Sequence, residues 1–467
     1  MDSKEPLGPS PAVLAKRDKV KPSQWCHKVN IEFDNWCDSD NPKTILPNDV
    51  IKAAAAITHE IPKTPLTKSR YTTKLNMDLY YKLEIFHRTG SFSERGALYS
   101  LKMLGVEQRK IGVITASLGN WAMALAYYGC KLNIPVTVVL PVYTLVSVVE
   151  KCKYFKAKVI LNGKNLAESK RHAFTILADS GKTYINGYDH PHVIAGAGTI
   201  GIEILEQLPQ IDAILVPVGG GGLIAGIAAI VKHIKPEVLI YGIEPVKCCS
   251  FFKAMENKWP YETAVSRSLA ESLAVPTAGY NAYNTAQSMI DKMVLVDDDW
   301  ITRAVLHLVE SEKIVVEGAG AVSMSALLAV PEIIPELREK TVVCLITGGN
   351  IDAVTLPKCL DRAKAVEGRL IKLTVALPVD GMKEQVQILR IIANVGCNIV
   401  RSYYERGWTT GNEFFKIYLT LLIETTGLEK SCTLKRVMER LFPDKCKFLE
   451  EPFSPIPMCA CFPKRFC

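Results

Sequence analysis

Short apolar segments alternate with segments of helical periodicity through most of this chain, and this alternation limits the possible folds. The apolar segments are rich in Val, Ile and Tyr and are bounded by Gly, Pro or Asn. They read DLYYKLEIF, GVITAS, PVTVVLP, AKVILNG, AILVPVG, LIYGIEP and TVVCLITGG. Strands that alternate with helices predict parallel sheets covered by helices on both faces, which is an α/β fold.

Length and composition exclude several classes of protein. The chain has 467 residues, of which 48% are hydrophobic, so two or three domains with buried cores are expected. The net charge of +8 is scattered without long basic runs, so no nucleic-acid partner is expected. The 14 cysteines contain no Cys-x-x-Cys pair, which indicates reduced thiols in a cytoplasmic protein.

The two ends of the chain differ from its body. Residues 1–45 are rich in Pro, Ser and Lys and lack the apolar core of a secretory signal, so they predict a disordered extension. Residues 453–467 form a Cys-rich tail that we also expect to be disordered. Residues 214–231 are apolar and long enough to test as a membrane span. Pro217 and four consecutive glycines favour a strand, a tight loop and a helix there, so no membrane partner is expected.

The pattern changes past Asp361, where the polar linker DRAKAVEGR begins. The order of predicted elements in residues 368–452 is βαββαβ, the ferredoxin-like split arrangement. These residues are therefore expected to form a second, smaller domain. The apolar face of its first helix is predicted to contain Val386, Leu389, Ile392 and Val395.

Three glycine-containing loops that follow strands carry the residue types of a binding site. In the loop GGGG, Gly219 to Gly222, the absence of Cβ atoms lets backbone N–H groups approach an anion at a helix N-terminus. Phosphate is the natural ligand, and close helix–strand packing is the alternative explanation. The loop matches neither a Walker A motif nor the dinucleotide fingerprint. The loops SLGN, Ser117 to Asn120, and TGGN, Thr347 to Asn350, suit a carboxylate or a heteroaromatic ring.

Together these motifs resemble the pyridoxal-phosphate enzymes of the serine/threonine dehydratase and serine racemase family. From about Ile45 to Arg362 the chain carries the family's motifs in order. They are TPL…S, KLE…RTGSF…RGA, SLGN, YDHPHVIAGAGTIGIEIL, PVGGGGLIAG, GIEP, VEGAGA and TGGNID. The resemblance implies a fold-type-II scaffold for residues 46–362, with two doubly wound parallel-sheet lobes. The C-terminal domain resembles the ACT-type regulatory domain that follows some dehydratases.

The resemblance also implies a role for each motif residue. The phosphate of pyridoxal 5'-phosphate would bind at Gly219, Gly220, Gly221, Gly222 and Leu223. Phe92 would pack near the ring, Asn120 would meet the ring hydroxyl, and Thr347 would contact the pyridine nitrogen. A neutral hydroxyl partner at that nitrogen fits β-elimination. The loop for the substrate carboxylate would contain Ser117, Leu118, Gly119 and Trp121.

Ser93 is the main departure from the family pattern, because it stands where the family has its Schiff-base lysine. Locally, Ser93 is a good helix cap, with Glu94 well placed in the first turn. A hydroxyl cannot form an imine, however, and losing an acid/base alone costs roughly 10²–10⁴ in rate. Lys82 lies in the preceding strand and is no obvious substitute. The cofactor is thus expected to bind non-covalently or to have been lost.

Further departures surround Ser93. Leu118 and Trp121 replace the small residue and the histidine that the family has in the substrate loop. The family's divalent-metal site keeps Glu244, but Ser250 stands where its Asp would be, so no metal is expected.

The sequence is interpreted as a homologue of L-serine/L-threonine ammonia-lyase, which forms a 2-oxo acid and ammonia, with impaired catalysis. One alternative is an active dehydratase that uses an unusual base. Another is a regulatory or partner subunit that senses amino acids through the ACT-like domain. The protein is expected to bind a small amino acid such as L-serine or L-threonine and to form a homo-oligomer, or a hetero-oligomer with an active, lysine-bearing paralogue. The sequence does not choose between serine and threonine, nor does it name the effector or the oligomer number.

Overall fold

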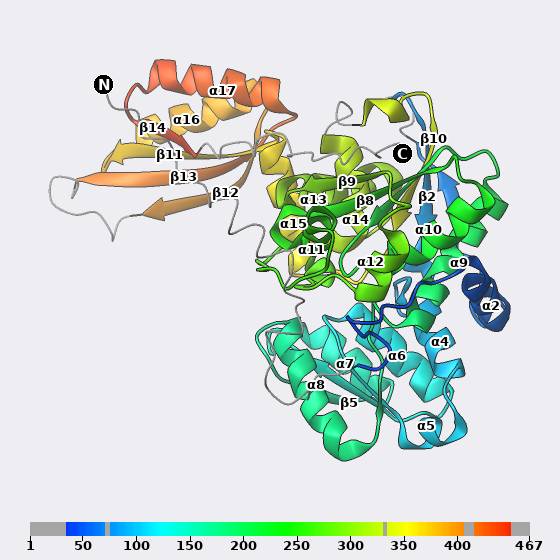
Figure 1. Cartoon of the computed structure of the whole chain (residues 1–467). Coiled ribbons are helices and arrows are strands. Elements are labelled where there is room, and N and C mark those ends of the chain that lie inside the picture. Colours follow the sequence, from blue (N-terminus) through cyan, green and yellow to red (C-terminus); the bar gives the residue numbers. More distant parts are fainter. Residues whose placement is uncertain (1–33, 71–74, 330–333, 406–414, 450–467) are drawn as a thin grey trace, which may run out of the picture.

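The computed structural model describes residues 34–70, 75–329, 334–405 and 415–449 (Figure 1). Most of the predicted N-terminal extension and the whole Cys-rich tail lie outside the described residues. The described part of the extension is ordered against the body of the protein. Asn281 donates from Nδ2 to the Trp36 carbonyl (2.6 Å) and accepts the N–H of Lys43 at Oδ1 (2.7 Å). Residues 34–45 of the predicted extension therefore contact the body of the protein.

A four-stranded parallel sheet in the order β5-β4-β3-β6 forms one lobe. Its strands are β3 (Val113–Ala116), β4 (Val136–Leu140), β5 (Lys158–Leu161) and β6 (Thr183–Tyr184). The helices of this part of the chain are α4 (Ser93–Lys102), α5 (Val106–Ile111), α6 (Asn120–Lys131), α7 (Val146–Tyr154) and α8 (Leu166–Ser180). Every residue of β3 and β4 is buried, as expected for parallel strands covered on both faces.

A six-stranded sheet in the order β1-β2-β10-β7-β8-β9 forms the second lobe. Its strands are β1 (Leu66–Lys68), β2 (Asp78–Leu83), β7 (Ala213–Pro217), β8 (Leu239–Pro245), β9 (Lys292–Val296) and β10 (Thr341–Ile346). The accompanying helices are α2 (Pro47–Ile57), α9 (Pro191–Gln207), α10 (Gly222–Ile234), α11 (Ser250–Asn257), α12 (Tyr280–Ala286), α13 (Asp298–His307), α14 (Gly318–Ala329) and α15 (Thr355–Val366). All pairings are parallel except β1 with β2 at the edge, which confirms the predicted α/β class.

The apolar run at residues 214–231 forms a buried strand, a glycine loop and a helix, as predicted. Within the described ranges, no helix is both long and apolar enough to cross a membrane. One hydrophobic core contains residues of both lobes, including Val136 of β4 and Ile214 of β7. The cavity described below is lined by residues of both lobes.

The C-terminal residues form a separate antiparallel sheet in the order β12-β13-β11-β14, with two helices (Figure 1). Its elements are β11 (Leu370–Pro378), α16 (Met382–Val395), β12 (Asn398–Glu405), β13 (Lys416–Glu424), α17 (Leu428–Leu441) and β14 (Cys446–Leu449). This order confirms the predicted βαββαβ arrangement. The sheet has its own core.

The apolar face predicted for α16 is only partly right. The buried side chains of this helix are Ile388 and Ile392, four residues apart, whereas Val386 and Leu389 are 53% and 37% exposed. At about 100° per residue, Val386 lies nearly opposite Ile388, and Leu389 lies to one side of the stripe formed by Ile388 and Ile392. Val386 and Leu389 instead line an apolar groove beside β11.

Candidate active site

One cavity brings together the three loops that the sequence singled out. Every residue proposed for the cofactor or the substrate lines it, namely Phe92, Ser93, Ser117, Leu118, Gly119, Asn120, Trp121, Gly219, Gly220, Gly221, Gly222, Leu223 and Thr347. The lining also includes residues that the sequence analysis did not assign, among them Tyr188, Ser272 and Glu317. The loops after β7 and β10 meet because these parallel neighbours present their carboxyl ends at one edge of the six-stranded sheet, and the loop after β3 faces them from the other lobe.

The glycine loop has the construction of an anion site. Gly221 has a φ of +93°, a conformation that favours glycine, and Gly222 begins the 13-residue helix α10. A Cβ atom at Gly220 would collide with the Tyr188 ring, and one at Gly222 would collide with the Tyr188 carbonyl oxygen. The backbone N–H groups of residues 219–223 donate no hydrogen bond to any described residue. These donors, together with the positive end of the α10 dipole, fit a phosphate.

Asn120 connects two loops to a buried carboxyl group. Its Nδ2 donates to Glu317 Oε1 at 2.5 Å, and its Oδ1 accepts from Asn350 Nδ2 at 2.9 Å. Burial raises the pKa of Glu317 to about 7, although hydrogen bonds from Asn120 and Ser272 oppose that rise. Sequence reasoning missed Glu317 as a site residue, yet its motif VEGAGA was among those that carried the resemblance.

Phe92 and Thr347 fix the start of α4 against the end of β10. The Phe92 N–H donates to the Thr347 carbonyl at 3.0 Å, and Ser91 forms a β-bridge with Gly348. The Thr347 hydroxyl donates to the Ala319 carbonyl at 3.4 Å. These contacts hold Ser93 at the cavity.

Ser93 is the first residue of α4 and is buried, with 7% exposure. The N-cap position belongs to Phe92, and the helix has no side-chain capping hydrogen bond, so the interpretation of Ser93 as a cap is wrong. The Ser93 hydroxyl forms no hydrogen bond with another described residue. Glu94 instead accepts the N–H of Thr89 and the Tyr128 hydroxyl (2.9 Å).

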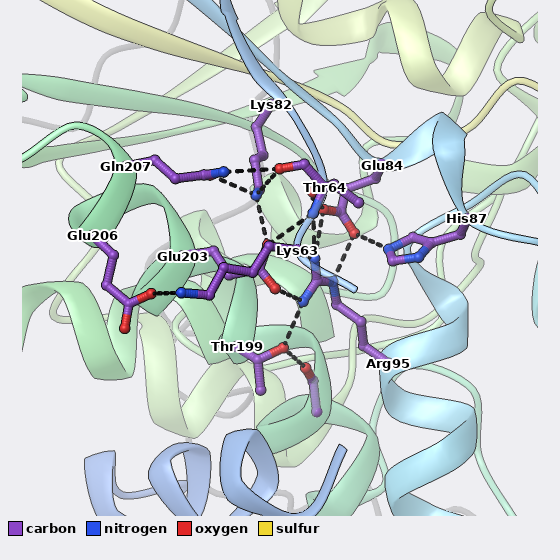
Figure 2. Close-up of polar contacts among 11 residues, drawn as sticks. Lys63, Thr64, Lys82, Glu84, His87, Arg95, Thr199, Glu203, Glu206 and Gln207 are labelled. Carbon is purple, nitrogen blue, oxygen red and sulfur yellow. Dashed lines mark hydrogen bonds and ion pairs between the residues drawn. The ribbon is translucent and has the colours of Figure 1, made fainter. Parts of the chain in front are cut away.

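Among the described residues that line this cavity there is no lysine. Lys82 is buried elsewhere, and its Nζ donates to Glu203 (2.6 Å), the Thr64 carbonyl (2.9 Å) and Gln207 (2.8 Å) (Figure 2). Lys151 is exposed, and its Nζ donates to Asn350 Oδ1 at 3.3 Å. Neither amine lines the cavity in place of the lysine that Ser93 replaces.

Side chains of the substrate loop form hydrogen bonds within the loop and with β3. Ser117 Oγ accepts the N–H groups of Gly119 (3.0 Å) and Ala122 (3.1 Å). The indole N–H of Trp121 donates to Thr115 Oγ1 at 2.9 Å, so it is turned toward β3 and engaged. Leu118 lines this cavity and also the adjoining cleft. The loop therefore offers a carboxylate fewer side-chain donors than the family pattern implies.

Glu244 is held by the backbone at the start of α11. Both carboxylate oxygens of Glu244 accept backbone N–H groups at the start of α11, from Phe251 (3.0 Å) and Phe252 (2.7 Å). Burial raises the pKa of Glu244 to about 8, against those two hydrogen bonds. In the part of the chain that the structure describes, no group of three or more His, Cys, Asp or Glu side chains is placed to hold a metal ion.

The buried network that holds Lys82 is centred on Arg95, which follows Ser93 by two residues. Arg95 binds Glu84 through Nε (2.7 Å) and Nη2 (2.9 Å), and it binds Glu203 through Nη1 (2.6 Å) (Figure 2). Burial would raise the pKa of Glu84, but Arg95 and His87 hold that pKa well below its usual range. The network joins β2, α4 and α9 in charged form and so anchors the segment that carries Ser93.

Two parallel-sheet lobes, with a glycine-loop cavity lined by both, define the scaffold of a fold-type-II pyridoxal-phosphate enzyme. The sequence model of the family described as "Pyridoxal-phosphate dependent enzyme" matches residues 57–348. The chain belongs to this family, in its threonine ammonia-lyase and serine racemase branch.

Named relatives agree with this assignment. The chain is similar to an L-threonine ammonia-lyase from Thermotoga maritima, with 32% identity over 77% of this chain and 88% of that protein. A second L-threonine ammonia-lyase, from Geobacter sulfurreducens, is 37% identical over 71% of this chain and 83% of that protein. The solved structure of the processed form of threonine deaminase isoform 2 from Solanum lycopersicum matches with a TM-score of 0.63. That match has 31% identity and covers 72% of this chain and 98% of that one.

Replacing Arg95 by Met should destabilise the protein by about 3–5 kcal/mol, because it leaves buried carboxylates without their cation. The free energy of unfolding in urea measures this loss. The control is Lys63→Met, which removes only an exposed ion pair with Glu206 and should change stability little. An equally small effect from both variants would show that the network is not a stabilising element.

Pyridoxal phosphate should raise the melting temperature of the purified chain, whereas pyridoxal, which lacks the phosphate, should raise it little. Ligand at about 100 Kd stabilises a fold by about 2.7 kcal/mol. Gly220→Asp should remove the shift by adding a negative charge and a Cβ atom at the loop, while Gly105→Asp in an exposed turn should keep it. Equal stabilisation by pyridoxal and pyridoxal phosphate would contradict the phosphate site.

Proposed function

We propose that this protein is a pyridoxal-phosphate-dependent ammonia-lyase for L-serine or L-threonine that works slowly and uses Glu317 as its base. The named relatives support the reaction class, and they favour an active dehydratase with an unusual base over an inactive protein. The absence of lysine from the lining of the cavity supports the low rate. We choose Glu317 as the base because its buried carboxyl group lies in the cavity and accepts a hydrogen bond from Asn120.

The bound cofactor would supply an electron sink that makes the α-proton of an amino acid acidic and lets the β-hydroxyl leave. The residues of this chain would hold it in place. Residues 219–223 would bind the phosphate through backbone N–H groups, Asn120 would meet the ring hydroxyl, and Thr347 would face the pyridine nitrogen. Phe92 would pack near the ring. Without a covalent bond at Ser93, these contacts alone would retain the cofactor.

Glu317 is suited to take up the proton because of its environment. Tyr188 is the other titratable side chain in the lining, and burial raises its pKa, so it stays neutral at physiological pH. Burial raises the pKa of Glu317 to about 7, so its carboxyl exchanges a proton in the neutral range. An acid/base with a pKa near the working pH is the most effective. Glu317 would thus perform part of the task that the missing amine performs in the family.

The substrate is proposed to be a small amino acid with a β-hydroxyl group. Its carboxylate would lie against the loop of Ser117, Leu118, Gly119 and Trp121. Leu118 narrows that loop, and Trp121 directs its donor to Thr115 instead, so the carboxylate would depend on backbone N–H groups. Misplacing a substrate by about 1 Å can cost on the order of 10² in rate, which adds to the effect of Ser93.

The cytoplasm is the proposed setting of this activity. All ten cysteines within the described ranges are free thiols. Free thiols are typical of a reducing compartment.

Ser93→Lys should restore a lysine-bound cofactor with its visible absorbance, which borohydride would fix as a pyridoxyl-lysine peptide. The unaltered chain should give no such peptide, because no lysine lines the cavity. The triple variant Ser93→Lys, Leu118→Ala, Trp121→His should exceed the single variant clearly in formation of 2-oxo acid from L-serine or L-threonine. Full activity of Ser93→Lys alone would show that the loop substitutions are tolerated. A partner-subunit role would gain support if both variants bound cofactor but remained inactive.

Glu317→Gln should lower the residual elimination rate on the order of 10²-fold, the lower bound for loss of an acid/base. In the unaltered chain the rate should rise with pH through about 7, as the carboxyl ionises, and this inflection should vanish in the variant. Glu271→Gln, in the adjoining cleft, is the matched control. Unchanged activity in Glu317→Gln would exclude it as the base.

The pH dependence of the unfolding free energy distinguishes a catalytic role of Glu317 from a folding defect in the Glu317→Gln variant. The pKa of Glu317 is raised in the folded state above its ordinary value of 4.5. Its contribution to stability is therefore fully present below pH 4.5 and is lost as the pH rises through about 7. Glu317→Gln should remain folded and should flatten the pH dependence of the unfolding free energy in that window.

A further inference from the structure

A second cavity, of about 290 Å³, adjoins the phosphate loop. It shares Leu166 and Tyr188 with the first cavity, and Tyr188 is the residue against which Gly220 and Gly222 pack. Its walls come from the ordered N-terminal segment that begins at Asp34, from α8, and from the segment before α12. Nothing in the proposed ammonia-lyase reaction uses this space.

Asp34 lines this cavity, and its carboxylate is incompletely satisfied. The residue is 7% exposed, and its Oδ1 accepts the N–H of Trp36 at 3.0 Å. Its Oδ2 is buried and has no hydrogen-bond partner among the described residues. The Cys37 thiol lies beside the same carboxyl, but a thiol is only a weak donor, so Oδ2 keeps its capacity for a strong one. A buried carboxylate oxygen without a donor is costly and indicates a missing partner.

Two cationic side chains line another wall of the same cavity. They are Lys170 and Arg171 of α8. Lys170 is close enough to Asp34 to oppose the rise in its pKa that burial causes. Its Nζ makes no hydrogen bond with any described residue and lies 5.6 Å from the centre of the Phe174 ring. The cavity therefore has an incompletely satisfied carboxylate on one wall and open donors on another.

The remaining acidic residues of the cavity are already occupied or exposed. Asp189 accepts the N–H groups of Tyr280 (3.0 Å) and Ala282 (2.9 Å) with its two oxygens. Asp38 accepts the N–H of Asp40, and Glu262 is exposed at the rim. These carboxylates would repel a ligand that carries only negative charge. The described residues also hold no cluster fit for a metal ion.

We propose that this cavity binds a free amino acid as a zwitterion, at a site separate from the pyridoxal cavity. The ammonium group would pair with the Asp34 carboxylate, and the ligand's carboxylate would accept from Lys170 and Arg171. A zwitterion is the small ligand that satisfies both walls without adding net charge. Because Tyr188 is shared with the phosphate loop, the bound amino acid would contact the same side chain that supports the cofactor site.

The test is isothermal titration of the full chain, without cofactor, against each of the twenty common L-amino acids. At least one should bind, and its analogues lacking the α-carboxylate or the α-amino group should bind far more weakly. Asp34→Asn and Lys170→Met should each weaken that binding by about 10-fold or more, as expected for a charge-assisted hydrogen bond. The matched controls are Asp179→Asn and Lys164→Met, which lie outside the cavity. They should leave the affinity unchanged.

Binding at another place would give a different pattern. A ligand in the pyridoxal cavity would be displaced by excess pyridoxal phosphate, whereas the proposed ligand should not be. Far-ultraviolet circular dichroism of each variant checks that the fold is retained. The proposal is wrong if no amino acid binds, if pyridoxal phosphate competes, or if Asp34→Asn and Lys170→Met bind with unchanged affinity. None of these outcomes depends on whether the ammonia-lyase activity is found.

Discussion

The ion network around Arg95 is the interaction on which the placement of the active site depends. A buried guanidinium needs partners, and Arg95 finds them in Glu84 after β2 and Glu203 on α9. Since Arg95 lies two residues beyond Ser93, the same contacts fix the start of α4 at the rim of the cavity. The network also binds Lys82 of β2, so this amine is directed to Glu203 and not into the cavity.

Two buried carboxyl groups show how differently this fold treats the same side chain. Glu84 faces Arg95 and His87, so its pKa lies well below the usual range despite burial. Glu317 is opposed only by hydrogen bonds from Asn120 and Ser272 and by the more weakly acting Lys151, so burial prevails and raises its pKa to about 7. The first group serves stability as a fixed charge. The second can change its protonation state near neutral pH, which is the property that acid/base chemistry requires.

Tyr188 connects the two cavities physically. Its ring and carbonyl oxygen lie against Gly220 and Gly222, and the same residue lines the neighbouring cavity of Asp34 and Lys170. Tyr188 packs so closely against the loop that a Cβ atom at Gly220 or Gly222 would collide with it. A ligand in the second cavity would therefore act on the support of the phosphate site rather than on the reacting atoms.

The sequence by itself determined the α/β class, the ferredoxin-like C-terminal sheet and the three loops, because strand periodicity and glycine conformation are local properties. It also placed Ser93 at the cavity. Only the tertiary structure decided which distant residues meet there. Glu317 lies 197 positions from Asn120 in the sequence. Asp34 and α8 are also separated in the sequence by several helices and strands. No local pattern therefore predicts either pairing. The sequence could not predict the pKa of Glu317 either, since that pKa depends on burial and on how weakly the neighbouring donors and Lys151 oppose it. The exposed side of α16 was set by how that helix packs on its sheet.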